Sequence, residues 1–263
     1  MNDALYIAAT GLQAHQAQMD AVAQNIANLS TPGYKRVKVD FQDMVQRVEA
    51  SQAEPASVPG QRVESTSTGV GRGVLAARLE RSFHHGELRR TDRPLDVALQ
   101  GVGFIELQSE DGSPAYARGG ALRTDAEGWL TLGDGFTPKQ RIQVPADVRD
   151  VRIAPDGDIL AVDENGRERL LGRLELVTFN EPSALQQVAP GIYRASPSAG
   201  DALSGVAGEG GLGRFVQGHL EQSNVKASEE FVMMMIAQRG YEMAVKVIQA
   251  ADELAALTNN LRK

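Results

Sequence analysis

Residues 228–261 read SEEFVMMMIAQRGYEMAVKVIQAADELAALTNNL, and this stretch decides the fold. Its apolar residues recur in alternating steps of three and four, the heptad spacing that holds one stripe of a helix against a partner helix. At about 1.5 Å per residue the predicted helix is roughly 50 Å long, too long to lie across one small domain. It therefore needs a partner. The stripe consists of Met233, Ile236, Gly240, Met243, Val247, Ala250, Leu254, Leu257 and Leu261, and Gly240 is its weak point.

The other end of the chain carries a second heptad and supplies a candidate partner. Away from the stripe, this predicted helix is rich in alanine and amides, and its charged residues are Asp3 and Asp20. A solvated helix face normally carries more charge, so we expect this face to be covered. The two stripes bury little apolar surface for two long helices, so we expect both ends to order on association with other copies. The second stripe consists of Leu5, Ala8, Leu12, His15, Met19, Val22, Ile26 and Leu29.

The composition indicates a chain that buries a sizeable core without cysteine chemistry. The 263 residues are 42% hydrophobic, enough for one large or two modest domains. The net charge of −7 argues against nucleic acid as the main partner, and the absence of cysteine excludes disulfides and thiolate sites. The longest wholly apolar run, at residues 231–237, is too short for membrane insertion. Because no lysine or arginine precedes Lys35, we expect no cleaved signal peptide.

Between the two helices the periodicity changes to short strands separated by turns that contain Gly, Asn and Asp. The spacing of Phe41, Met44, Val45 and Val48 predicts a short third helix from Val37 to about Gln52. Residues 51–73 and 195–213 are rich in small and polar residues and predict extended arms. The predicted strands are Val74–Leu79, Leu95–Leu99, Gly103–Gln108, Ala115–Arg118, Trp129–Leu132, Val151–Ala154, Asp158–Val162 and Leu170–Phe179.

These patterns predict an α+β fold, in which a discontinuous coiled-coil domain of the terminal helices receives an inserted, mainly antiparallel β domain. We expect residues 1–35 and 217–263 to form the helical assembly domain. Residues 36–73 are the predicted short helix and arm, residues 74–194 the β-rich domain, and residues 195–216 a flexible return arm.

Two segments carry a family resemblance. Residues 25–36, NIANLSTPGYKR, are similar to the N-terminal signature of bacterial flagellar rod and hook proteins. Residues 220–225, LEQSNV, followed by EEFV at 229–232 and QRGYE at 238–242, resemble the C-terminal signature of that family. The length of the chain and the TGVG segment at 68–71 most resemble a subunit of the distal rod. Gly240 departs from the family, which usually has alanine there, so we expect Gly240→Ala to stiffen the helix unless close backbone approach requires glycine.

The resemblance implies a structural, non-enzymatic subunit that polymerises through its terminal helices into a hollow, torque-transmitting axle, with the β domain outside. It implies a place in the periplasm-spanning rod of the basal body and export through the flagellar apparatus without a cleaved signal. The implied partners are other copies of the chain, other rod proteins and the hook, ring proteins of the periplasm and outer membrane, and the export apparatus. No cofactor, metal, nucleic acid or membrane insertion is expected.

The resemblance also implies which residues pack between subunits. Asn25, Asn28 and Asn224 are expected to fix turns or to make hydrogen bonds between subunits. The remaining predicted packing residues are Leu5, Leu12, Met19, Val22, Ile26, Leu29, Val225, Met233, Ile236, Gly240, Tyr241, Met243, Val247, Leu254, Leu257 and Leu261.

Other functions remain open as alternatives. Within the family the alternative is a proximal rod or hook-like axial subunit. From another class, the alternative is a secreted β-domain binding module or polysaccharide enzyme whose terminal helices dimerise it. The motif evidence for chemistry is weak: the glycines at 208–213 follow no strand and crossover, and Ser223 and Lys226 lack the partner motifs of penicillin-binding enzymes. His84, His85 and Glu87 do not complete a zinc site.

Overall fold

The computed structural model describes residues 2–47, 69–146, 148–163 and 166–260. They form two compact units, each discontinuous in the sequence. The smaller unit comprises Met1–Ala23, Lys38–Leu79 and Ser228–Lys263, and the larger unit comprises Gln24–Val37 and Glu80–Ala227. Long helices at the two ends and antiparallel strands between them confirm the predicted α+β fold.

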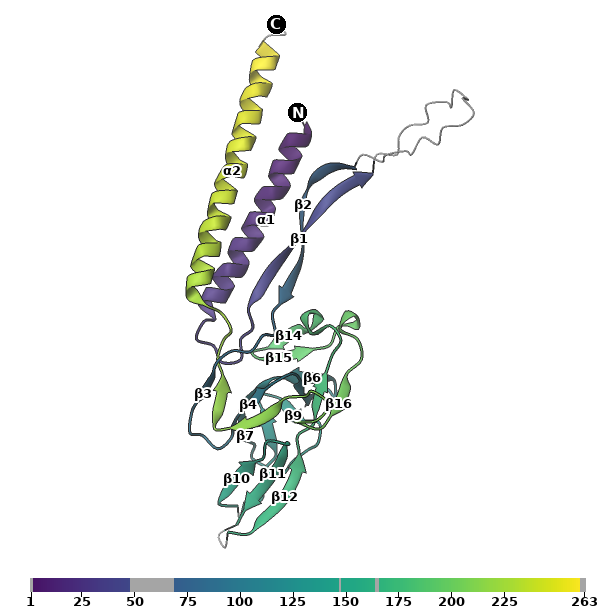
Figure 1. Ribbon diagram of the computed structural model, residues 1–263, viewed down its shortest axis with the longest axis vertical. Helices are drawn as coiled ribbons and strands as arrows, with labels where there is room; N and C mark the ends of the chain where they lie inside the picture. Colours follow the sequence, from purple (N-terminus) through teal and green to yellow (C-terminus); the bar gives the residue numbers. More distant parts are fainter. Residues whose placement is uncertain (1, 48–68, 147, 164–165, 261–263) are drawn as a thin grey trace, which may run out of the picture. The chain divides into compact units, whose positions relative to one another are not determined.

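The smaller unit places one helix between a second helix and a strand hairpin (Figure 1). The helices are α1, Asn2–Ala27, and α2, Ala227–Asn260, whose bounds lie within three residues of the ends of the predicted stretches, 5–29 and 228–261. The hairpin consists of β1, Val37–Arg47, and β2, Gly69–Arg81. It contacts α1 where the Val74 backbone N–H donates to the Thr10 hydroxyl at 3.3 Å. Both terminal helices therefore belong to one unit, although they lie at opposite ends of the sequence.

Strand β1 corrects the prediction of a short third helix. Residues 37–47 are extended, and residues 48–52 of that predicted helix lie outside the described part of the chain. Val37 and Val39 are more buried than the intervening Lys38 and Asp40, which is the two-residue period of a half-buried strand. Two patterns compete in this stretch: apolar and polar residues alternate at 37–42, which indicates a strand, and Phe41, Met44, Val45 and Val48 have a helical spacing. The strand pattern is the one that the fold follows. The predicted arm at 51–73 is described only from Gly69, where β2 begins.

The larger unit is built from antiparallel pairs (Figure 1). Its largest sheet has seven strands, ordered β14-β15-β6-β5-β13-β16 with β9 also paired to β5, and a second sheet has the order β17-β4-β7-β8. A three-stranded sheet has the order β10-β11-β12, and β18 pairs with β3. The bounds are β3 Leu88–Arg90, β4 Asp96–Gln100, β5 Phe104–Ser109, β6 Pro114–Ala117, β7 Gly119–Thr124, β8 Leu130–Leu132, β9 Phe136–Pro138, β10 Asp150–Ile153, β11 Asp158–Val162, β12 Glu168–Arg173, β13 Leu176–Thr178, β14 Gln186–Ala189, β15 Ile192–Arg194, β16 Leu203–Gly205, β17 Arg214–Gln217 and β18 His219–Glu221, with short 3-10 helices at Pro182–Ala184 and Pro197–Ala199.

The predicted strands all coincide with observed ones, but the return arm is corrected. The stretch predicted as one strand at 170–179 is two, β12 and β13. Residues 195–216, predicted as a flexible arm, contain β16 and most of β17. Strand β17 pairs along its whole length with β4, whose first four residues are buried. The small and polar residues of this stretch show no local periodicity, because their strands are formed by pairing with distant segments.

Two hydrophobic clusters form the core of the larger unit. The main cluster gathers aliphatic residues from several sheets, among them Leu99, Ile105 and Leu176. The second cluster is aromatic, and the rings of Tyr116 and Phe179 meet edge to face with centroids 4.8 Å apart. This unit contains the N-terminal signature at residues 25–36 and the first part of the C-terminal signature at residues 220–225.

Candidate functional site

The side chain of Asn25 holds the backbone at the start of β1. Its Nδ2 donates to the carbonyl of Val37 at 2.8 Å, and its Oδ1 accepts from the Val37 N–H at 2.9 Å and from the Tyr34 hydroxyl at 3.1 Å. Asn25 is buried, so these bonds satisfy groups that water does not reach. Asn28 acts more locally, because its Nδ2 donates to the carbonyl of Gln24 at 2.9 Å. Both asparagines therefore fix the turn that follows α1.

Asn224 joins the two signature segments. Its Oδ1 accepts from the backbone N–H of Arg36 at 2.7 Å, and its Nδ2 donates to the carbonyls of Ser82 and His84 at 2.8 and 3.0 Å. In the same region the Gly33 N–H donates to the carbonyl of Glu221 at 2.7 Å. Hydrogen bonds thus connect three segments: residues 33–36, residues 221–224 and residues 82–86.

A buried group of charged side chains occupies this meeting point, and we call Lys35, His85, Arg118 and Glu221 the junction cluster. Lys35 is fully buried, and its Nζ lies 2.6 Å from Oε1 of Glu221 and 2.9 Å from the carbonyl oxygen of His84. Arg118, which follows β6, donates from Nε to Oε2 of Glu221 at 3.4 Å. Its other nitrogens donate to the carbonyls of Gly103 and Gly101 at 3.2 and 2.8 Å. Two cations therefore share one carboxylate.

Burial dominates the electrostatics of this cluster. Desolvation lowers the pKa of Lys35, and the neighbouring carboxylate of Glu221 opposes that shift. The Glu221 Oε1 also accepts from the Gly86 N–H at 2.9 Å, so its lone pairs are well occupied. A buried ion pair is costly to break because removal of one partner leaves the other charge desolvated. Loss of any one of these charges would therefore destabilise the contact between residues 33–36 and residues 221–224.

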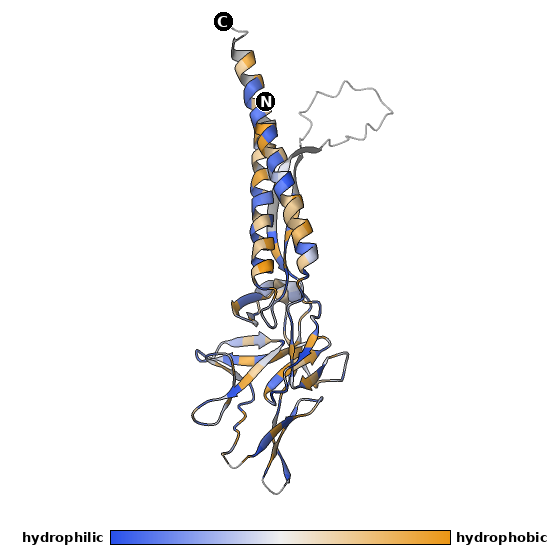
Figure 2. Cartoon of the chain, turned by 90° about the vertical axis from the view of Figure 1, so that its left-hand side faces the viewer, coloured by the Kyte–Doolittle hydropathy of each residue, from blue (hydrophilic) through white to orange (hydrophobic). Residues whose placement is uncertain are grey.

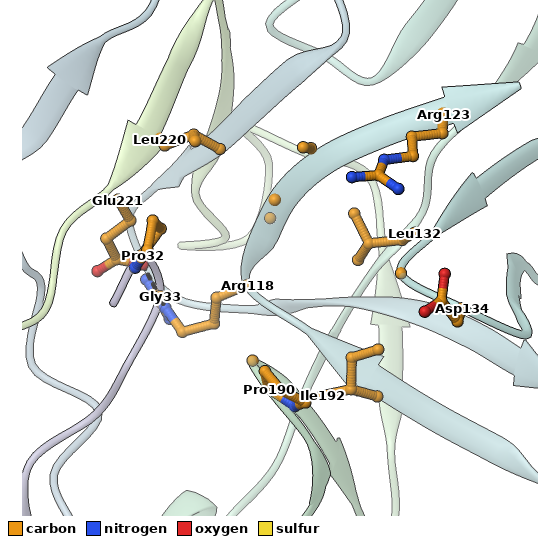
Figure 3. Close-up of a pocket in the computed structure, with 15 residues that line it drawn as sticks. Pro32, Gly33, Arg118, Arg123, Leu132, Asp134, Pro190, Ile192, Leu220 and Glu221 are labelled. Carbon is orange, nitrogen blue, oxygen red and sulfur yellow. Dashed lines mark hydrogen bonds and ion pairs between the residues drawn. The ribbon is translucent and has the colours of Figure 1, made fainter. Parts of the chain in front are cut away.

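A pocket of about 320 Å³ lies beside the cluster (Figure 3). Figure 3 shows the Arg118 side chain reaching toward Glu221 and Gly33, while Arg123 and Asp134 lie on the other side of the pocket. The charged groups that line it are two arginines and two carboxylates, and much of its wall is glycine backbone. It shows no arrangement of nucleophile, base and orienting group that would support catalysis.

The long helix α2 exposes a stripe of large apolar side chains, which we call the α2 stripe. Met243, Leu254 and Leu257 are each about 60% exposed (64%, 59% and 59%), although monomeric proteins usually bury such side chains. In Figure 2, which is coloured by hydropathy, hydrophobic residues recur along the length of α2. The stripe has the heptad spacing identified in the sequence and consists of Met233, Ile236, Met243, Val247, Leu254 and Leu257.

A different stripe of α2 faces α1. It also has heptad spacing and includes three alanines, of which Ala237 is fully buried. Gly240, a member of the predicted stripe, borders it and meets the imidazole ring of His15. The predicted stripe therefore does not pack on residues 5–29 of the same chain, except at Gly240. The close approach of the helices at His15 favours small residues, which explains the difference. The stripe that faces α1 consists of Glu230, Met234, Ala237, Tyr241, Ala244, Ile248 and Ala251, all buried or half-buried.

The predicted packing residues of α1 are more buried than those of α2. Val22 is buried, and Leu5, Leu12, Met19 and Ile26 are half-buried. Elsewhere among the predicted packing residues, Leu29 is exposed at the helix end, Val225 is buried and Tyr241 is half-buried, while Leu261 lies outside the described residues. The assignment of these residues to contacts between subunits stays a prediction.

The sequence reasoning missed the junction cluster. Lys35 and Glu221 stand inside the two signatures, yet their 186-residue separation hides their pairing. The sequence does place opposite charges, Lys35 and Glu221, in the two signatures, and this is the feature from which an ion pair could have been predicted. Among the described residues, no three His, Cys, Asp or Glu side chains gather as a metal site. Over the same part of the chain, none of the helices combines the length and apolar character that crossing a membrane requires.

Three family models match this chain. A model described as the flagella basal body rod protein matches residues 5–35, and one described as the flagellar hook protein FlgE/F/G D1 domain matches residues 98–161. A model described as the flagellar basal body rod FlgEFG protein C-terminal matches residues 216–261. The first and third cover both signatures and extend into both helices.

Curated relatives match along nearly the whole chain. The flagellar basal-body rod protein FlgG of Agrobacterium fabrum is 34% identical, over 97% of this chain and 98% of the relative. The FlgG protein of Borreliella burgdorferi is 31% identical over the full length of both chains. The flagellar basal-body rod protein FlgF of Escherichia coli is 32% identical over 99% of this chain and 98% of the relative.

Proposed function

Because the chain belongs to the family of flagellar basal-body rod proteins and is a structural rod subunit, we propose that it polymerises through α1 and α2 into the distal rod. The α2 stripe is the observation that supports this mode of assembly. Six large apolar side chains along one helix remain exposed while a separate stripe of the same helix faces α1. In the polymer, neighbouring copies cover the α2 stripe and so hold the rod rigid enough to transmit torque.

The outer face of α1 supports the same proposal. Its exposed positions include Ala9, Gln13, Gln16 and Ala23, which carry no charge. Asp20 is the one charged residue on α1 among those whose side chains are described. A face of this composition loses little hydration when another helix covers it. One chain therefore offers two different helix faces to its neighbours, and contacts between unlike faces generate rings or, where the rotation does not close, open helical polymers.

The remaining parts of the proposal follow from the family. We propose contacts with other rod proteins and with the hook at the ends of the polymer, and with ring proteins and the export apparatus of the flagellum. The β-rich unit then forms the outer part of the rod. Similarity to a FlgF protein keeps a different rod position as the second candidate. Electron microscopy of basal bodies that carry a labelled copy of this protein distinguishes the two positions.

A charge placed in the α2 stripe tests the assembly mode. Met243→Glu should leave the single chain folded, because Met243 is 64% exposed, and should abolish polymerisation and motility. Gln249→Glu adds the same charge at an exposed polar position of the same helix and should assemble more readily. Sedimentation and electron microscopy of the purified proteins report assembly, and circular dichroism reports folding. Normal polymers of Met243→Glu would contradict the assignment of the stripe.

A further inference from the structure

The ring of His85 accepts a hydrogen bond from a cation. Its Nδ1 lies 2.9 Å from Nη2 of Arg118. A guanidinium has only donors, so Nδ1 must offer a lone pair, and the ring is neutral with its proton on Nε2. Protonation of Nδ1 removes this bond and turns an attraction between the two side chains into a repulsion. The pairing of His85 with Arg118 therefore depends on the protonation state of one nitrogen.

The surroundings of His85 make its protonation unfavourable. Arg118 and Lys35 are cationic, and one carboxylate, that of Glu221, serves both of them. A protonated His85 would be a third positive charge beside that carboxylate. Burial, followed by the charge of Arg118, lowers the pKa of His85 from its ordinary value, and Glu221 opposes the shift.

Solvent reaches His85 without unfolding of the chain. The residue is exposed, and it lines a pocket of about 460 Å³ together with Glu87, Arg89 and Lys226. The neighbouring residue His84 also contributes to lowering the pKa of His85. A proton can therefore reach the ring from water, while Arg118 behind it is buried. This combination of an accessible base and a buried partner suits a pH-sensitive contact.

The segment that carries His85 also holds both signatures. The Gly86 N–H donates to Oε1 of Glu221, and the carbonyl of His84 accepts from Lys35 Nζ and from Asn224 Nδ2. Displacement of His85 from Arg118 thus strains bonds to residues 33–36 and to residues 221–224 at once. We propose that His85 is an acid-sensitive switch whose protonation loosens the junction cluster and the meeting of the two signatures. The proposal concerns a single chain and stands independently of the assembly mode.

The stability effect has a definite sign. Because the pKa of His85 is lower in the fold than in the unfolded chain, the unfolded chain binds the proton more tightly. The junction is therefore fully stable above the unfolded pKa of about 6.5 and loses stability as the pH falls below it. A pKa lower by one unit corresponds to about a tenfold difference in proton affinity between the two states.

A nitrogen NMR titration of the histidine rings in the full chain tests the protonation state directly. The expected result is the Nε2–H tautomer for His85 at about pH 7.5 and a midpoint below about 6.5. A ring that carries its proton on Nδ1, or that is already charged at neutral pH, would overturn the proposal. This measurement needs no variant, so it remains decisive even if substitutions at His85 disturb folding.

Hydrogen exchange tests the mechanical consequence. The amides of Gly33, Arg36 and Gly86 donate hydrogen bonds in the junction, so their protection factors should fall as the pH drops from about 7.5 to about 5.5. His85→Gln keeps an acceptor for Arg118 but cannot gain a proton in this range, and its protection should stay constant. His84→Gln, the matched control, should behave as the wild type. Equal losses in wild type and His85→Gln, or no loss in the wild type, would refute the switch.

Discussion

The imidazole ring of His15 on α1 fills the space beside Gly240 on α2. A methyl group on Gly240 would lie 2.8 Å from Nδ1 of that ring and closer still to its Cε1 and Nε2 atoms. This contact explains why the heptad of α2 is interrupted by glycine. The side chain of His15 packs where a residue with a Cβ would stand, so the two helices approach closely at this point.

Gly240→Ala should destabilise the helix pair. Alanine improves the intrinsic helix propensity by about 0.5–1 kcal/mol, but overpacking at a close contact costs about 1–3 kcal/mol. The sequence alone favoured a stiffer helix, and the contact with His15 reverses that expectation. Thermal unfolding and hydrogen exchange of α1 measure the effect. The double variant His15→Ala/Gly240→Ala should recover the loss, and additive effects of the two substitutions would contradict the contact.

Glu221→Gln should destabilise the larger unit strongly. The substitution keeps the shape but leaves the buried charges of Lys35 and Arg118 without their carboxylate, which costs about 3–5 kcal/mol. Glu168→Gln is the matched control, because its pair with Arg152 is exposed and such pairs contribute about 0–1 kcal/mol. Urea unfolding of the two variants gives the comparison. Similar midpoints for both would mean that the junction cluster contributes little.

Asn25→Ala should cost more than Asn28→Ala. The first change removes the buried hydrogen bonds that Asn25 makes to the N–H and carbonyl of Val37 and to the hydroxyl of Tyr34, and losing a partner costs a buried polar group about 1–3 kcal/mol. Asn28 makes its bond to Gln24 in an exposed position, where a hydrogen bond contributes about 0.5–1.5 kcal/mol. Chemical denaturation ranks the two variants. The reverse order would show that Asn25 does not hold the start of β1.

Asp158→Asn should weaken the three-stranded sheet at neutral pH but not in strong acid. The hydrogen bond from Arg173 holds the pKa of Asp158 below its ordinary value. The stabilising effect is therefore present above the unfolded pKa and disappears as the pH falls through the folded pKa. Hydrogen exchange in β11 and β12 should differ between variant and wild type at about pH 7 and converge once the pH falls below the lowered folded pKa of Asp158. Asp201→Asn, at an exposed position, should show no such difference.

Local sequence patterns predicted the elements well where the pattern arises within the element itself. The heptads placed α1 and α2 within a few residues, and alternation with turn residues located the strands of the β-rich unit. They failed at β1, where an apolar spacing competed with the strand alternation, and at residues 195–216, where β17 pairs with the distant strand β4. Strand pairing depends on the neighbour as much as on the residues themselves, so such segments have weak local signals.

The site was predictable in part. The asparagines at 25, 28 and 224 were identified from the signatures, and each makes hydrogen bonds within the chain, while contacts of these residues between subunits stay a prediction. The junction cluster was not predictable, because Lys35, Arg118 and Glu221 come from three distant segments. Nothing in the local sequence distinguishes a lysine that becomes fully buried from one that stays in water.

The sequence by itself determined that two long helices stand at the ends of an inserted β domain and that the chain resembles flagellar axial proteins. Only the tertiary structure decided which side of α2 faces α1. Successive residues of a helix differ by about 100° in direction, so two stripes one position apart share the same heptad spacing but face different ways. The side that faces α1 carries Ala237, Ala244 and Ala251, and Gly240 borders it where the ring of His15 packs. The large apolar stripe remains exposed in the single chain.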